Sequence, residues 1–246
     1  NAGLNGSVTV YVCKVRISGL NSQTTYHYKA RNGSTLGSDA TFKTAPDEQT
    51  PFSFGVAGDS QMVARRLIGD TPHPECSSAM FTDMASMADI AVSIGDVVDN
   101  SSYGLYTSAF RPYMCNILGK QKPVFIAFGN HDVPSDSLIH KMVQNSGMHS
   151  FSFNYGNAHF TCIDYVDCMK GTLLWDGNID SLPLGWIQQD LSSDDAQNAT
   201  WRFLFIHVPP YCERWFAGSS LMQTYLVPLL NQYNVQACFS GHTHEY

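Results

Sequence analysis

Five short apolar runs in this chain end in the same way, and this repeated pattern constrains the fold more than any other feature. Each run leads into a turn that carries Asp, Asn or His: FSFGVAGDS (52–60), IAVSIGDVVDN (90–100), PVFIAFGNHD (123–132), WRFLFIHVPP (201–210) and QACFSGHTH (236–244). Short apolar runs that alternate with amphipathic segments are typical of buried strands in a layered α/β fold. Because ligands gather at the carboxyl ends of such strands, we expect the five turns to converge on one site.

The segments between these runs predict the covering helices and the rest of the scaffold. Apolar spacing favours helices over 77–88, 103–118 and 184–191, which would cover the sheets. The segment HSFSFNYGNAHFTCIDY (149–165) alternates in the manner of a strand pair.

The first 46 residues differ from the rest, because they are rich in strand-forming residues and turns. The runs VTVYVCKVRI (8–17), TYHYKA (25–30) and ATFKT (40–44) predict three strands, whereas an immunoglobulin-like or fibronectin-like sandwich has about seven. We therefore expect a partial all-β, fibronectin III-like domain over 1–46, a linker over 47–52, and an α/β catalytic domain over 53–246. We expect this last domain to continue beyond Tyr246.

The turns at the strand ends carry side chains of the types that bind metal ions. They offer three oxygen and three nitrogen donors, a mixture that suits Zn, Fe or Mn: Asp59, Asp96, Asn130, His207, His242 and His244. The net charge of −7 argues against binding to a nucleic-acid backbone. An acidic chain can still bind a small phosphate ester if bound cations provide the positive charge.

The order of these motifs resembles the metallophosphoesterase (calcineurin-like) superfamily. The motifs are GD, GDxxD, GNHD, an apolar strand that ends in His, and GHxH. Each alone is a common turn, but five in fixed order make coincidence improbable. TFKTAP (41–46) and YGNAHFTCID (155–164) resemble the purple acid phosphatase branch. The resemblance implies a four-layer fold, in which a β-sandwich is flanked by helices.

The same resemblance implies a role for each motif residue. Asp96 would bridge two metal ions, Asp59 and His244 would bind the first ion, and Asn130, His207 and His242 the second. The implied reaction is hydrolysis of phosphomonoesters by a hydroxide held between the ions, with His131 as general acid. Asn130, His131 and Tyr211 are the candidate substrate-binding residues, and the loops over 132–147 and 164–183 are expected to shape the pocket.

Two residues depart from the family pattern, and both concern the first metal. Asp99 stands where purple acid phosphatases have a Tyr, so no ferric-tyrosinate colour is expected. Gln61 stands where many other members have a His. Asp99 either binds the first metal or pairs with His131 and orients it for catalysis.

Two other functions are open, and the departures at Gln61 and Asp99 favour only the second of them. A phosphodiesterase or nucleotide pyrophosphatase could use the same site. A binding protein that has lost catalysis is a further alternative, in which the β-rich segment would bind the partner.

The compartment is predicted from weaker signals. No apolar stretch is long enough to span a membrane, and Asn5, Asn32, Asn100 and Asn198 each begin a glycosylation sequon. We therefore expect a secreted or secretory-pathway glycoprotein. Cys162 and Cys168 would form a disulfide in an oxidising compartment or remain free thiols otherwise. The oligomeric state is not predicted.

Overall fold

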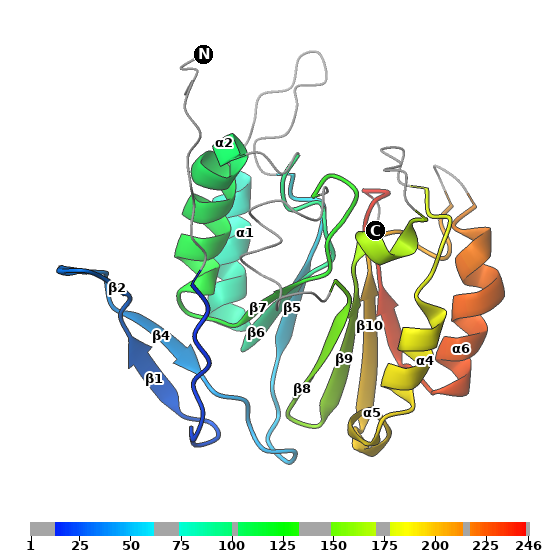
Figure 1. Ribbon diagram of the computed structural model, residues 1–246, viewed down its shortest axis with the longest axis horizontal. Helices are drawn as coiled ribbons and strands as arrows, with labels where there is room; N and C mark the ends of the chain where they lie inside the picture. Colours follow the sequence, from blue (N-terminus) through cyan, green and yellow to red (C-terminus); the bar gives the residue numbers. More distant parts are fainter. Residues whose placement is uncertain are drawn as a thin grey trace.

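The centre of the molecule is a pair of β-sheets (Figure 1). The computed structural model describes residues 13–61, 74–99, 103–132, 149–170, 178–213 and 217–244. The first sheet has the order β5-β6-β7 and is parallel throughout: β5 (Phe54–Ala57), β6 (Ile90–Ser93) and β7 (Val124–Ile126). These strands are the apolar runs that the sequence predicts.

The second sheet has the order β11-β10-β9-β8. Its strands are β8 (Phe151–Tyr155), β9 (Ala158–Ile163), β10 (Trp201–Ile206) and β11 (Ala237–Phe239). Strand β10 runs parallel to both β9 and β11, while β8 and β9 form the antiparallel pair expected over 149–165. All strands that lead into predicted ligands are therefore parallel to their neighbours.

Aromatic side chains fill the space between the two sheets. Phe54 of the first sheet meets Phe160 of the second edge to face, with ring centroids 5.3 Å apart, and Phe125 stacks on Phe153. Val92, Phe160 and Phe205 are fully buried in this cluster. Burial of such rings is the main force that holds sheet on sheet.

Helices cover the outer face of each sheet (Figure 1). On the first sheet lie α1 (Pro74–Met87), α2 (Tyr103–Leu105) and the π-helical η1 (Tyr106–Gly119), and Phe81 and Phe110 are among their buried residues. On the second lie η2 (Tyr165–Cys168), α4 (Leu184–Leu191), α5 (Asp194–Asn198), η3 (Met222–Leu226) and α6 (Val227–Gln232). The fold is thus a helix–sheet–sheet–helix α/β arrangement, and the three predicted helices are present.

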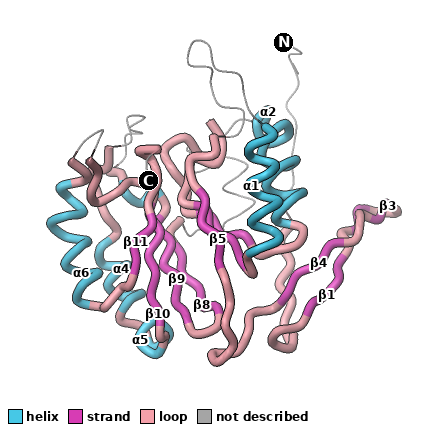
Figure 2. The backbone as a smooth tube through the Cα atoms, turned by 180° about the vertical axis from the view of Figure 1, so that it is seen from behind, coloured by secondary structure: helices cyan, strands magenta, loops and turns pink. Residues whose placement is uncertain are grey.

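The N-terminal segment projects from this body as a small β-structure (Figure 2). Strand β1 (Thr25–Tyr28) pairs antiparallel with β4 (Ala40–Lys43), and between them β2 (Arg31–Asn32) pairs with β3 (Thr35–Leu36). The strand predicted over 8–17 is wrong for its described part, because 13–17 has no strand partner among the described residues; 8–12 lie outside them. A fibronectin-like domain therefore stays a prediction.

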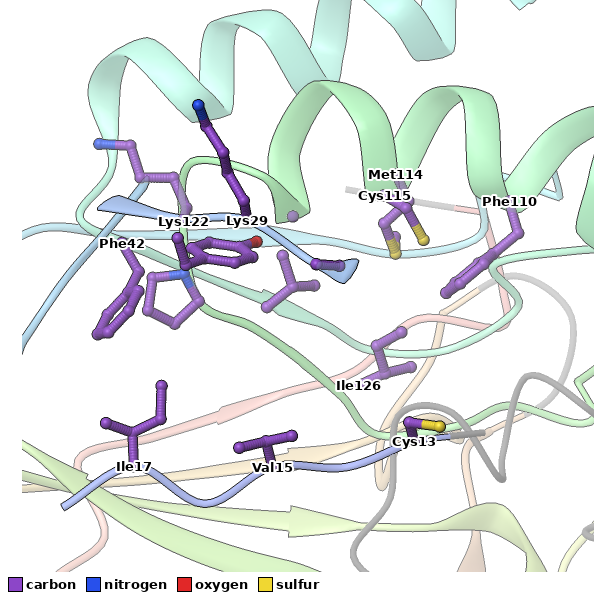
Figure 3. A pocket seen from close by; sticks show the side chains of 15 residues that line it. Cys13, Val15, Ile17, Lys29, Phe42, Phe110, Met114, Cys115, Lys122 and Ile126 are labelled. Atoms are coloured by element: carbon purple, nitrogen blue, oxygen red, sulfur yellow. The ribbon is translucent and has the colours of Figure 1, made fainter. Parts of the chain in front are cut away.

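An apolar cavity of about 820 Å³ separates the segment 13–17 from the body of the molecule. Figure 3 shows Cys13, Val15 and Ile17 on one side, with Phe110 and other η1 residues opposite them. The residues that line the cavity include none of the predicted metal ligands. Among the described residues, no helix has the length and apolar character that a membrane span needs.

Candidate metal centre

The six predicted ligands all lie in turns that directly follow strands. Asp59 follows β5, Asp96 follows β6 and Asn130 follows β7. His207 comes immediately after β10, and both His242 and His244 follow β11. Backbone hydrogen bonds join these turns: Asp59 N donates to Gly95 O at 3.0 Å, and Gly241 N to His207 O at 2.9 Å.

Three of these side chains form a compact buried cluster. One ligand atom from each of Asp96, His207 and His242 lies within 4.8 Å of the others. The Nε2 atom of His207 lies 3.3 Å from Oδ2 of Asp96 and 3.0 Å from Oδ1 of Asn130. Asp96, Asn130 and His207 are at most 1% exposed. Four of the six predicted ligands are thus adjacent and shielded from water.

The orientation of His207 is set by a hydrogen bond behind the cluster. Its Nδ1 atom donates to the backbone carbonyl of Ile94 at 2.8 Å. In the neutral ring, this bond leaves the lone pair on Nε2, the atom that faces Asp96 and Asn130. Histidines that bind metals are commonly oriented in this way.

The other two predicted ligands form a more open half of the site. Nε2 of His244 lies 3.4 Å from Oδ1 of Asp59, and the His244 side chain is 46% exposed. The carboxylate of Asp59 accepts the backbone N–H of His242 at 2.9 and 3.0 Å. Asp59 is thereby tied to the turn that carries both C-terminal histidines.

Backbone strain is concentrated at these turns. Seven non-glycine residues of the described chain have positive φ, and five belong to this site: Asp59 (53°), Gln61 (33°), Asp96 (49°), His242 (71°) and His244 (53°). Such conformations cost free energy and cluster where function requires them. Gly95, at φ 95°, has no room for a side chain, since a Cβ atom there would lie 2.5 Å from Gly129 N and 2.8 Å from His207 Nδ1.

Proximity shifts the pKa values of the clustered groups. Burial works to lower the pKa of His207, but the carboxylates of Asp96 and Asp59 outweigh it and raise the pKa to about 9. Burial, reinforced by His207, lowers the pKa of His242 to about 4. Burial acts to raise the pKa of Asp96, but His207 holds it below its usual value, whereas burial and Asp96 raise the pKa of Asp59. His242 is therefore neutral and able to bind metal even in mildly acidic solution, whereas His207 carries a second proton that a bound metal ion would have to replace.

His131 stands at the edge of this cluster, against Asp99. Its Nδ1 atom lies 2.9 Å from the backbone carbonyl of Asp99 and 3.7 Å from the Asp99 carboxylate. Its Nε2 atom is 3.9 Å from Oδ2 of Asp96, and its side chain is 30% exposed. His131 thus lies between the metal-ligand cluster and solvent, with Asp99 behind it.

The structure gives less support to the other predictions about the site and the cysteines. Tyr211, in the loop after β10, is 63% exposed, and its contact with substrate stays a prediction. Most of the predicted pocket loop 132–147 and part of the loop 164–183 lie outside the described residues. Cys162 and Cys168 are free thiols in separate core clusters, so the structure favours that alternative over a disulfide.

The sequence analysis did not predict the places of two residues near the site, Gln61 and Asp132. Gln61 donates from Nε2 to Oδ2 of Asp96 at 3.4 Å, so it reaches the predicted bridging carboxylate. Asp132 is completely buried beside the ligand turns. Asp132 is the last letter of the GNHD motif, and this position was the only sequence signal that could have identified it.

The donor set fits a bound metal ion. Carboxylate, amide and imidazole donors converge from five strand ends, and His207 presents the correct nitrogen. In the two-ion arrangement that the sequence resemblance implies, Asp96, Asn130, His207 and His242 would hold one ion, and Asp96, Asp59 and His244 the other.

Comparisons with known proteins agree on one family. The family model for calcineurin-like phosphoesterases matches residues 54–246. Purple acid phosphatase 23 of Arabidopsis thaliana is 22% identical over an alignment of 281 positions, gaps included, which covers 99% of this chain and 59% of that protein. An acid phosphatase of Aspergillus ficuum is 28% identical over 129 residues, which cover 39% of this chain and 21% of that protein.

Among solved structures, a purple acid phosphatase from yellow lupin (Lupinus luteus) seeds superposes with a TM-score of 0.64 at 19% identity. The match covers 92% of this chain and 45% of that one. The chain therefore spans less than two thirds of the length of these proteins. With the family model matched over 54–246, the chain belongs to the calcineurin-like phosphoesterase family and resembles its purple acid phosphatase branch.

Proposed function

We propose that this chain is a dinuclear metal-dependent hydrolase that cleaves phosphomonoesters. The observation that carries the proposal is the convergence of Asp96, His207 and His242 in one buried cluster. Asn130 adjoins this cluster, and Asp59 and His244 extend it. The names of the Arabidopsis and Aspergillus relatives support a phosphatase over other uses of the fold.

Bound cations would supply positive charge for the phosphoryl oxygens and would activate water as the nucleophile. The residues of the chain hold that arrangement in place. Asp96 contributes negative charge at the centre of the cluster, while the hydrogen bond to Ile94 directs His207 inward. The buried faces of Asn130 and His207 exclude water that would weaken these electrostatic interactions.

His131 is the proposed general acid that protonates the leaving oxygen. While Nδ1 donates to the Asp99 carbonyl, a proton delivered from Nε2 requires the doubly protonated ring. The Asp99 carboxylate, 3.7 Å away, is placed to balance that positive charge. We therefore assign Asp99 the pairing role and leave binding of the first metal as its alternative.

Metal dependence and substrate preference test this proposal together. The purified chain is stripped with a chelator, reloaded with Mn²⁺, Zn²⁺ or Fe²⁺, and assayed on p-nitrophenyl phosphate and on bis(p-nitrophenyl) phosphate. We expect hydrolysis of the monoester that disappears with the metal and returns on reloading. A preference for the diester would instead favour the phosphodiesterase alternative.

The same samples test the alternative of a non-catalytic binding protein. This alternative is favoured by the exposed His244 and by the Gln61 amide that donates to Asp96. It predicts less than one metal ion per chain and no hydrolysis with any of the three metals.

A secretory location remains part of the proposal. Asn32 and Asn198 are exposed, as glycan attachment requires. Mass analysis of the protein from its native source would detect the expected glycans.

A further inference from the structure

Asp132 is a fully buried carboxylate for which the proposed reaction has no role. Both of its oxygens accept hydrogen bonds from the backbone: Oδ1 from Val97 N at 3.0 Å and Val98 N at 3.3 Å, and Oδ2 from Gly129 N at 2.9 Å. Val97 directly follows Asp96, and Gly129 directly precedes Asn130. One carboxylate therefore joins the turn after β6 to the turn after β7.

A second hydrogen bond joins the same two turns in the opposite direction. The backbone N–H of His131, on the turn after β7, donates to Oδ1 of Asp96 at 2.9 Å. Each turn thus supplies a carboxylate to backbone donors of the other. Such reciprocal bonding fixes two segments more firmly than a single contact, because a shift of one turn against the other must break bonds in both directions.

The two turns are also packed without spare room. A Cβ atom on Gly129 would lie 2.3 Å from Oδ1 of Asp96 and 2.8 Å from the His207 ring. A small shift of one turn would therefore displace the Asp96 carboxylate or the His207 ring. Both belong to the candidate metal centre.

We propose that Asp132 is a positioning residue that holds Asp96, Asn130 and His131 at their working separation before metal and substrate bind. The inference rests on the proposed function, since the separation matters only if these residues share a metal centre. Partners that orient metal ligands affect binding without touching the ion. An Asp132 that served stability alone would leave metal affinity unchanged in the folded protein.

The substitution Asp132→Asn tests the inference with little change in volume. The amide has only one oxygen, so it can accept hydrogen bonds from one turn, and its NH₂ group then faces an N–H of the other. We expect Mn²⁺ affinity, measured by electron paramagnetic resonance, to fall by about 10- to 100-fold. Near-ultraviolet circular dichroism would verify that the variant is folded.

Asp190→Asn is the matched control. Asp190 of α4 is a half-buried carboxylate that also has three donors, Ser152, Thr161 and His159, but these lie on β8 and β9 away from the ligand turns. The same chemical change there should leave Mn²⁺ affinity within about twofold of the wild-type value. Equal losses of affinity in the two variants would assign the effect to general destabilisation and overturn the inference.

A measurement on the wild-type protein covers the case in which Asp132→Asn does not fold. Amide hydrogen exchange of Val97, Val98 and Gly129 is followed in the metal-free chain, where slow exchange is expected because Asp132 already holds these N–H groups. Exchange as fast as in an open loop would overturn the inference. So would wild-type Mn²⁺ affinity in a folded Asp132→Asn variant.

The outcomes also separate this inference from the proposed function. If the wild-type chain binds Mn²⁺ and hydrolyses no ester, the activity fails while the role of Asp132 in metal binding is still tested by the variant pair. If the wild-type chain binds no Mn²⁺, both fail.

Discussion

Two polar clusters in this molecule use nearly the same residue types in opposite ways. In the candidate metal centre, Asp96, Asn130 and His207 adjoin His242 at the strand ends. In the second cluster, Asp190 accepts hydrogen bonds from Ser152 at 2.5 Å and Thr161 at 2.7 Å, and lies 3.1 Å from His159. His159 is also 2.7 Å from Asn154. Asp, Asn and His occur in both places.

The difference lies in what these side chains face. Around Asp190, donors and acceptors meet one another, and none of these five residues has positive φ. At the metal centre, side chains of the types that bind metal ions face one another from several turns, and the backbone is held in strained conformations. A polar cluster satisfied by its own members adds to stability, whereas a cluster that needs a cation to balance its charge is suited to function.

The largest effect that this comparison predicts is a loss of metal affinity when Asp96 is substituted. Asp96→Asn removes the negative charge at the centre of the cluster while it keeps the size of the side chain. We expect the loss of metal affinity to exceed the roughly 100-fold typical of residues that only orient ligands. Metal content per chain, measured by mass spectrometry, checks this, with the exposed Asp83→Asn as control. Normal metal content in Asp96→Asn would remove the distinction between the clusters.

A smaller effect is expected at Asp99. If Asp99 pairs with His131, Asp99→Asn should lower kcat by about 10²-fold, the lower end for general acid catalysis, with metal content unchanged. His131→Ala should then lower kcat by at least as much, and the double variant should be little worse than His131→Ala alone. Loss of one metal ion from Asp99→Asn would instead make Asp99 a ligand.

The second cluster should show the reverse behaviour. Asp190→Asn replaces a carboxylate that accepts three hydrogen bonds, so we expect the free energy of unfolding to fall by about 1–3 kcal/mol. Hydrolysis at a temperature well below the unfolding midpoint should be unaffected. Urea unfolding together with the monoester assay measures both. A drop in kcat at full folding would contradict the purely structural role of this cluster.

The smallest expected effect is on the pH dependence of the free energy of unfolding. Burial works to raise the pKa of Asp190, but the hydrogen bonds from His159, Ser152 and Thr161 outweigh it and hold the pKa below its usual value. A depressed pKa adds stability above the unfolded-state value, and this stability is lost as the pH falls through the folded-state value. The gap in unfolding free energy between wild type and Asp190→Asn should therefore narrow as the pH falls below about 4. Urea unfolding at pH 7, 5 and 3.5 would reveal a constant gap if the pKa were not depressed.

The sequence predicted the elements that depend on local pattern. Strands β5, β6, β7, β10 and β11 follow from short apolar runs, and the turn residues at their ends follow from the parallel arrangement. These features were predictable because strand polarity alone brings carboxyl ends to one edge. The helix 184–191 has the predicted bounds.

Features that depend on distant contacts were not predictable in this way. The run 8–17 alternates like a strand, yet its described part has no strand partner, and alternation cannot supply one. The hydrogen bonds from Val97 and Val98 to Asp132 join residues that are 35 and 34 positions apart, and no local pattern marks them. The contact between Gln61 and Asp96 likewise appears only after the two turns have been brought together.

The positive φ angles of Asp59, Asp96, His242 and His244 affect how the sequence of such a chain can evolve. Glycine adopts this conformation without steric cost, whereas each of the four present side chains costs on the order of 1 kcal/mol there. Replacement by glycine would therefore relax the backbone at the same step that removes a ligand. Substitutions that remove these side chains would therefore meet no opposition from backbone strain. Only selection for the chemistry itself would keep all four side chains in place.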